Sequence, residues 1–382
     1  MEKSLDLKLQ MIHADPAGCR EFIIADAKDA DMGFGIPAPG NWRGAASEPE
    51  RYKTLEDYRE QIRQVIRQGV VDIVLMSVST GEKLCLEERL FDDSHVTPAI
   101  RANDATDIFV FRGSTIPKEP ARPFRTALLD HAQCGHVDCD PADRAYGVDL
   151  GLYSVTFNNQ CEVDLETLNA YREFRVEAER KGFRHFLEVF HPNLPGVANS
   201  TTIPQFINDV IARTLAGVSS AGRPIFLKIP YPGPGALEEL VAYDPHLVVG
   251  ILGGSSGTTR DAFQMIHDAQ KYGARVALFG RKINFAENQL AFIEFLRHIV
   301  DGVLTPEEAV RAYHSVLAKL KIQPARSLEE DLLVTETSMS YAANKPSVVE
   351  APAKAQSKEQ VDFSKMTSAE RLAYHRERLK HL

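Results

Sequence analysis

Short, nearly continuous apolar runs recur along this chain, and longer amphipathic stretches separate them. Runs that are apolar at every position are typical of strands buried on both faces of a parallel sheet. The third strand has two candidate positions, because either of two apolar runs fits its place. The eight predicted strands are residues 22–25, 70–78, 95–102 or 107–111, 148–157, 185–190, 224–229, 247–252 and 275–279.

Helical periodicity fills most of the intervals between these runs. Strands that alternate with helices favour a parallel sheet, and eight of them fit a closed (β/α)₈ TIM barrel. A doubly wound open sheet is the alternative, but it usually carries a glycine-rich nucleotide loop after its first strand, where this chain has DAKDAD at 26–31. The predicted helices are residues 54–68, 165–181, 203–215, 235–241, 258–271, 286–300 and 305–321.

Composition excludes several classes of protein. The chain of 382 residues has a net charge of −9, which gives a nucleic-acid partner no overall electrostatic support. It contains no apolar run of the ~20 residues that span a bilayer, and its first residues lack a secretory signal. Five cysteines, an odd number, predict no disulfide framework. A soluble protein of the reducing cytoplasm is the resulting expectation.

The composition changes near the C-terminus. We expect a barrel domain over residues 1–322, an extension and linker over 323–360, and a short amphipathic helix over 361–382. Residues 344–360 are expected to form a disordered linker because they are rich in Pro, Ala, Ser, Lys and Glu. The final helix is similar to the encapsulation peptides that direct enzymes into bacterial microcompartment shells. Packing on the same barrel or on a neighbouring subunit is the alternative.

Lys228 is the most informative residue of the predicted strands, because no other strand core contains a lysine. Burial of an ammonium is costly, so the group either pairs with a carboxylate or becomes neutral. A neutral amine can attack a carbonyl carbon to form an imine. The alternative is an ion pair with Glu188 or Asp26 that only holds the barrel together.

The sequence FLKIPYPGPG around Lys228 resembles the class I, Schiff-base aldolases of the deoxyribose-phosphate, archaeal-type fructose-bisphosphate and tagatose-bisphosphate aldolase superfamily. The resemblance extends from about residue 23 to 284 and is strongest from Phe226 onward. It implies an imine-forming lysine on strand six, a phosphorylated sugar or small aldol as substrate, and a homo-oligomer. It implies no metal and no cofactor.

Glycine-rich turns follow predicted strands seven and eight. Backbone N–H groups in such turns, and at the start of the next helix, can bind phosphate. Both the resemblance and this physical argument assign phosphate binding to these turns, although the glycines could simply permit tight turns. The candidate phosphate-binding residues are Gly253, Gly254, Ser255, Gly280 and Arg281.

Four further residues are candidates for the site. Asp26, at the end of strand one, and Glu188, in strand five, are carboxylates that could move protons or pair with a base. Tyr153, in strand four, is either a proton donor, as the resemblance implies, or a packed aromatic residue. The polar stretch 101–107 is either a βα loop that reaches the site, with Arg101 binding an anionic substrate, or a surface turn.

The segment 130–140 gathers Asp, His and Cys residues, but their spacing is not that of a standard zinc site, so a polar loop is favoured over a metal. Three functions remain open. The first is an aldolase-like lyase that uses a Schiff base on Lys228. The second is another barrel lyase or isomerase that acts on phosphorylated substrates with Lys228 as a base. The third is a non-catalytic barrel that serves as scaffold or cargo.

Overall fold

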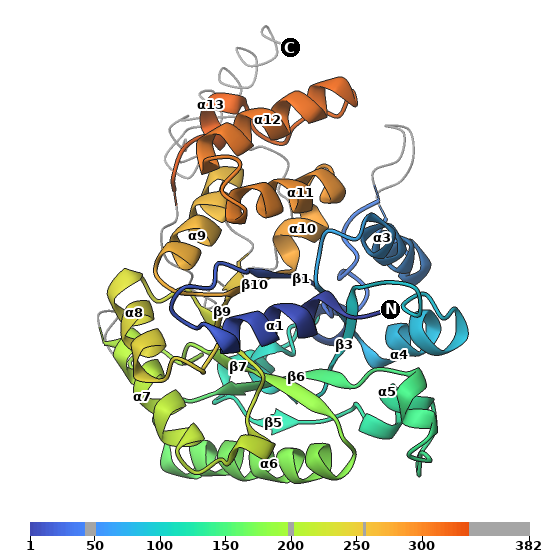
Figure 1. The fold of residues 1–382 in the computed structure, drawn as a ribbon, viewed down its shortest axis with the longest axis vertical. Coiled ribbons are helices and arrows are strands. Elements are labelled where there is room, and N and C mark those ends of the chain that lie inside the picture. Colours follow the sequence, from blue (N-terminus) through green and yellow to red (C-terminus); the bar gives the residue numbers. More distant parts are fainter. Residues whose placement is uncertain (43–50, 198–201, 255–256, 336–382) are drawn as a thin grey trace, which may run out of the picture. The chain divides into compact units, whose positions relative to one another are not determined.

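The computed structural model describes residues 1–42, 51–197, 202–254 and 257–335 (Figure 1). Within these residues eight parallel strands close into a barrel in the order β1-β10-β9-β8-β7-β6-β3-β2. This confirms the predicted (β/α)₈ barrel. The barrel strands are β1 (Ile23–Lys28), β2 (Ile73–Met76), β3 (Thr97–Arg101), β6 (Leu150–Thr156), β7 (Arg184–Phe190), β8 (Leu227–Pro230), β9 (Val249–Gly253) and β10 (Val276–Phe279).

Helices surround the barrel (Figure 1). The α-helices are α1 (Ser4–Ala14), α2 (Asp31–Phe34), α3 (Leu55–Gln68), α4 (Val78–Gly81), α5 (Leu129–Cys134), α6 (Cys161–Arg180), α7 (Ile203–Leu215), α8 (Pro234–Tyr243), α9 (Thr259–Lys271), α10 (Arg281–Phe285), α11 (Gln289–Val300), α12 (Pro306–Lys319) and α13 (Leu328–Asp331). Shorter elements are the π-helix η1 (Glu82–Glu87), the 3₁₀ turns η2 (Thr106–Ile108), η3 (Ile116–Lys118), η4 (Asp143–Tyr146) and η5 (Ser220–Gly222), and the hairpin of β4 (Asp104–Ala105) and β5 (Pro123–Phe124). None of the described helices is both long and apolar enough to cross a membrane.

The third strand is β3, so the candidate at 95–102 is right and the one at 107–111 is wrong. The segment 107–111 instead lies in the long connection between β3 and β6, and its first two residues belong to η2. Helix α1 was not among the predicted helices. Its buried residues Leu5, Leu9 and Ile12 pack with the first inward-facing residues of the strands, so α1 closes the N-terminal end of the barrel.

Alternation along the strands decides which side chains enter the barrel. The interior cluster contains Ile23 and Ala25 of β1, whereas Ile24 belongs to the larger cluster between strands and helices. Phe186 and Phe226 stack inside the barrel with ring centroids 4.5 Å apart. The next inward positions on their strands are Glu188 and Lys228. These two polar side chains therefore form the layer next to the stacked Phe rings.

The segment after α12 packs against the barrel domain as far as residue 335. Asp331 of α13 accepts a hydrogen bond from the Thr259 backbone N–H at 2.7 Å and contacts His314 Nε2 at 2.9 Å. Thr335 donates to Asp261 from both its backbone N–H and its hydroxyl. The predicted boundary at 322 therefore does not coincide with the end of packing. Residues 336–382, with the predicted C-terminal helix, lie outside the described residues.

Candidate active site

Lys228 and Glu188 form an ion pair inside the barrel. They are register partners on the neighbouring strands β8 and β7, and Lys228 Nζ lies 2.6 Å from Glu188 Oε1. The Glu188 side chain is fully buried and that of Lys228 is 7% exposed. A carboxylate this close can accept a proton from the ammonium, which is the step that makes a lysine nucleophilic. The pairing that the sequence suggested for Glu188 is observed.

Arg101 and Asp29 extend this pair into a four-charge network. Arg101 donates from Nε to Asp29 Oδ2 at 2.5 Å, and its Nη2 lies 3.5 Å from Glu188 Oε2. Burial raises the pKa of Asp29, but the charges of Arg101 and Lys228 outweigh this and hold the pKa below its ordinary value. Two carboxylates, of Asp29 and Glu188, thus face the cationic side chains of Arg101 and Lys228. Arg101 is 6% exposed and holds carboxylates in place, so it does not lie in a surface turn, and its role in binding a substrate anion stays a prediction.

Ser154 links these charges. Its hydroxyl donates to Glu188 Oε2 at 2.6 Å and accepts from Arg101 Nη1 at 2.9 Å. Asn103, fully buried, fixes the backbone of Ser154 by accepting from its N–H at 2.6 Å and donating to its carbonyl at 2.8 Å. With its second oxygen held by Ser154, Glu188 presents its other oxygen to Lys228.

Asp26 does not face this site. It is the register partner of Val74 and Phe279, which belong to the layer between strands and helices, and it pairs with Lys28 Nζ at 3.3 Å. Both side chains are fully buried. Asp29, three residues later and on the opposite face of the chain, takes the place predicted for Asp26. Lys28 also corrects the expectation that Lys228 is the one lysine of the strand cores.

Tyr153 also faces outward. Its ring stacks on Phe174 of α6 with centroids 4.4 Å apart, and it contacts Tyr171 of the same helix. Burial raises its pKa above the ordinary value, which disfavours the phenolate form. The structure therefore places Tyr153 as a packed aromatic residue, the alternative left open by the sequence, because inward and outward positions alternate and Ser154 takes the inward one.

The predicted phosphate turns lie at the ends of β9, which neighbours β8, and of β10, which follows β9 in the barrel. A Cβ on Gly253 would lie 2.1 Å from the Phe279 ring, and one on Gly280 would lie 2.8 Å from the Ala27 carbonyl oxygen. Close packing therefore requires glycine at both positions. Gly254 is buried, and Ser255 lies outside the described residues. Arg281 opens α10 with its guanidinium 5.9 Å from the Phe34 ring centroid.

Helix α9, the expected source of a positive dipole end, is already capped by carboxylates. The Thr258 backbone N–H donates to Asp261 Oδ2 at 2.7 Å, and that of Thr259 donates to Asp331 Oδ1 at 2.7 Å. A substrate phosphate at these two amides would have to displace both side chains. Of the predicted phosphate site, the backbone of Gly254 and Gly280 therefore remains as a candidate for binding phosphate.

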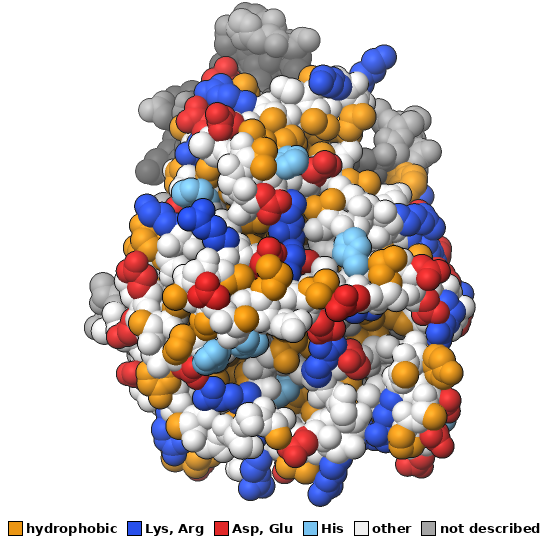
Figure 2. Space-filling view, viewed as in Figure 1, with side chains coloured by type: hydrophobic (Ala, Val, Ile, Leu, Met, Phe, Trp, Pro, Cys, Tyr) orange, Lys and Arg blue, Asp and Glu red, His pale blue; other side chains and the backbone are white. Residues whose placement is uncertain are grey.

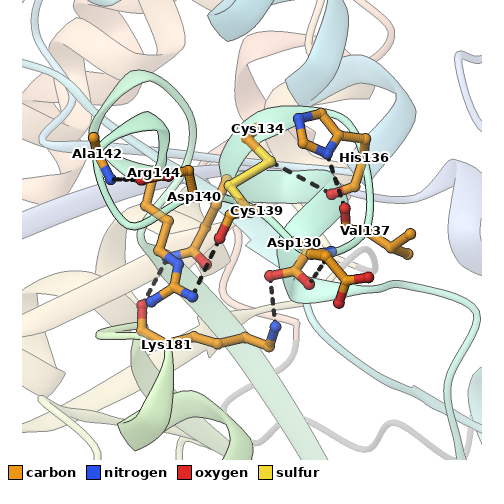
Figure 3. Close-up of a disulfide and its surroundings, with 11 residues drawn as sticks. Asp130, Cys134, His136, Val137, Cys139, Asp140, Ala142, Arg144 and Lys181 are labelled. Atoms are coloured by element: carbon orange, nitrogen blue, oxygen red, sulfur yellow. Dashed lines mark hydrogen bonds and ion pairs between the residues drawn. A yellow bond between two sulfur atoms is a disulfide. The ribbon is translucent and has the colours of Figure 1, made fainter.

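The segment 130–140 forms a tight polar loop (Figure 3). Cys134 and Cys139 are joined in a disulfide, which the sequence did not predict; Gly135, at φ 88°, ends α5 and turns the chain back. Asp130 is engaged by Lys181 Nζ at 2.5 Å and by the Asp138 N–H at 3.1 Å. Among the described residues no group of three His, Cys, Asp or Glu side chains could hold a metal ion.

The sequence argument missed Asp29 and Ser154, and within the polar stretch 101–107 it singled out neither Asn103 nor Asp107. The phase of β1 was the available signal for Asp29, since residues 23, 25 and 27 are apolar and enter the barrel. The same phase places Ser154 inward after Leu150 and Leu152. Asn103 and Asp107 follow β3 in an irregular connection, where no periodicity exists to assign a direction.

Comparison with solved structures finds aldolases that share this barrel fold. A fructose-bisphosphate aldolase from Slackia heliotrinireducens matches with a TM-score of 0.58 and 14% identity, over 81% of this chain and 91% of that one. A Schiff-base-forming fructose-1,6-bisphosphate aldolase matches at 0.53 and 16%, over 78% and 100%. An archaeal fructose-1,6-bisphosphate aldolase, whose catalytic lysine carries a carbinolamine intermediate, matches at 0.53 and 16%, over 77% and 99%.

At these identities the likeness establishes a shared fold, the (β/α)₈ barrel of the archaeal-type fructose-bisphosphate aldolases. No protein-family model and no curated protein sequence matches the chain.

Proposed function

We propose that this protein is a class I aldolase-like lyase that makes or breaks a carbon–carbon bond through a Schiff base on Lys228. The observation that carries the proposal is the buried ion pair of Lys228 with Glu188 at the carboxyl ends of the barrel strands. Active sites of (β/α)₈ barrels lie at this end. A purely structural ion pair would be an expensive choice here, because apolar residues of similar size commonly stabilise a core as well or better.

The chemistry follows from the network. Glu188 takes a proton from the Lys228 ammonium, and the free amine attacks the carbonyl carbon of the substrate. Loss of water gives a protonated imine, which accepts the electron pair released when the adjacent C–C bond breaks. Arg101 and Ser154 both contact Glu188 Oε2 and so keep this carboxylate oriented through the cycle.

The phosphorylated class of substrate rests on the turns after β9 and β10. Gly250 is the register partner of Lys228, and Gly253 lies three residues further along β9. At ~3.3 Å per residue this places the turn roughly 10 Å beyond the lysine along the strand. A phosphorylated sugar of a few carbons spans such a distance. We propose that the backbone of Gly254 and Gly280, with Arg281, binds its phosphate.

Intact-mass measurement after borohydride reduction tests the proposal. The protein is incubated with dihydroxyacetone phosphate, fructose 1,6-bisphosphate, deoxyribose phosphate or lactaldehyde, and the imine is reduced to a stable amine. We expect a mass gain equal to the carbonyl compound less one oxygen, absent in Lys228→Met. The matched control is Lys28→Met, which removes the other lysine of the barrel strands and should keep the adduct.

The absence of an adduct with every compound would refute the Schiff base. Turnover that persists without an adduct would instead assign Lys228 as a base in a non-covalent lyase or isomerase. Binding of no sugar phosphate at all would favour the non-catalytic scaffold.

The C-terminal segment 361–382 lies outside the described residues, and a role in targeting to a microcompartment shell remains a proposal. Deletion of residues 344–382 should leave adduct formation and folding unchanged if the segment is an address. A large loss of either would contradict that role.

A further inference from the structure

The connection between β3 and β6 carries a further acidic residue, Asp107, to the end of the barrel that holds Lys228. This connection is firmly held. The Thr106 N–H donates to the Arg122 carbonyl at 3.0 Å, and the Arg122 N–H donates to Thr106 Oγ1 at 2.8 Å. On the other side, the Val110 N–H donates to the Gly33 carbonyl at 3.1 Å. The turn η2 is therefore a fixed part of the site.

Ile108, next to Asp107, shows where η2 lies. It packs in one cluster with Phe190 and Leu252. Phe190 is two residues beyond Glu188 on β7, and Leu252 is two residues beyond Gly250, the register partner of Lys228. Side chains two apart on a strand share a face, so this cluster forms the layer directly above the Lys228–Glu188 pair.

The Asp107 carboxyl group reaches into this layer. Its Oδ2 accepts a hydrogen bond from Thr156 Oγ1 at 2.7 Å, and Thr156 is two residues beyond Ser154, which itself bonds Glu188. Its Oδ1 is shielded from solvent and has no hydrogen-bond partner among the other described residues. The charges of Glu188 and Arg101 both act on this carboxyl group.

A second carboxylate of the same connection provides the contrast. Asp104 Oδ2 accepts hydrogen bonds from both the N–H and the hydroxyl of Thr126, at 3.2 and 3.0 Å. These contacts give Asp104 a role in holding the connection in place. Asp107 has one oxygen held by Thr156 and the other without a partner among the other described residues, as expected for a carboxylate that exchanges protons with a substrate.

We propose that Asp107 is the acid–base residue that acts on the substrate carbon skeleton, while Glu188 serves the lysine nitrogen. This rests on the proposed Schiff-base function. In cleavage, Asp107 Oδ1 takes the proton of the hydroxyl group beside the breaking bond. That C–O becomes a carbonyl, the C–C bond breaks, and its electron pair enters the imine to give an enamine. The carboxylic acid then returns the proton to the enamine carbon, and water releases the product from Lys228.

The test separates imine formation from proton transfer at carbon. Asp107→Asn, which preserves shape and can still accept from Thr156, is incubated with dihydroxyacetone phosphate. We expect the borohydride-trapped adduct on Lys228 to form as in the parent. Exchange of the substrate C–H for deuterium in D₂O should fall about 100-fold or more, the contribution typical of a general base. The matched control Asp104→Asn, whose amide oxygen can still accept both hydrogen bonds from Thr126, should exchange within a few-fold of the parent.

Each outcome has one meaning. Exchange by Asp107→Asn within threefold of the parent would overturn the role of Asp107. So would loss of the adduct in this variant, since that would make Asp107 a structural support of the lysine. An adduct missing from the parent would instead refute the Schiff-base function itself.

Discussion

Replacing Asp26 and Lys28 together should stabilise this protein. Burial raises the pKa of Asp26 from 3.8 to about 6, against the opposing charge of Lys28, and burial also lowers the pKa of Lys28. Neither group forms a hydrogen bond elsewhere in the described residues. The rise for Asp26 of about 2 in pKa corresponds to roughly 3 kcal/mol of unfolding free energy. At neutral pH the buried pair of Asp26 and Lys28 therefore gives a lower free energy of unfolding than apolar residues would give in its place.

The sign of the pH dependence follows from the folded pKa of Asp26, which lies above its unfolded value. Its contribution to stability is fully present below about pH 4 and is lost as the pH rises through about 6. The parent should therefore lose up to about 3 kcal/mol over this window through Asp26. The variant Asp26→Val/Lys28→Met carries neither group and should lack that loss.

Urea unfolding of parent and double variant at pH 4, 5, 6 and 7 measures both effects. We expect the double variant to be about 1–4 kcal/mol more stable at pH 7, with the difference shrinking toward pH 4. Its adduct formation on Lys228 should match the parent, because both replaced side chains face away from the barrel interior. A double variant that is less stable at pH 7, or that loses the adduct, would refute this account of the pair.

Three further predictions concern the site and its surroundings. Glu188→Gln removes the ionised partner of Lys228 and should slow imine formation about 100-fold, measured by time-resolved trapping; an unchanged rate would exclude Glu188 as the proton acceptor. Burial, and then the negative charge of Glu188, raise the pKa of Asp107 to about 6, while Thr156 and Arg101 oppose the rise. As a base Asp107 works when ionised, so deuterium exchange should fall about tenfold per pH unit below 6, and a flat profile to pH 5 would contradict its role. Asp331→Ala should cost about 1–3 kcal/mol in urea unfolding by leaving the α9 amide unpaired, with adduct formation intact; no change in stability would show that this contact is dispensable.

On the face shown in Figure 2, acidic and basic side chains are interspersed, without a large area of one sign. Such surface pairs contribute little to stability individually, since solvent screens them. Buried charges interact more strongly, and an unpaired buried charge costs the fold more.

The sequence by itself determined the barrel and the position of its principal lysine. Continuous apolar runs at eight places require strands buried on both faces, and Lys228 within one of them must pair or lose its charge. Glu188 followed for the same reason, as a carboxylate on the preceding strand. These conclusions depend only on which segments are buried, and the apolar composition of a segment indicates that.

Only the tertiary structure decided which polar side chains meet. Asp26 and Asp29 lie three residues apart, and the phase of β1 sends them to opposite faces, so that Asp29 joins Arg101 while Asp26 faces the helices. Asp107 reaches the site through an irregular connection whose path is fixed by contacts with distant segments. The cap of α9 by Asp331 joins residues 72 positions apart. A sequence shows composition and periodicity along the chain. Contacts between side chains that are distant in sequence depend instead on how the barrel closes and on the path of the connections between its strands.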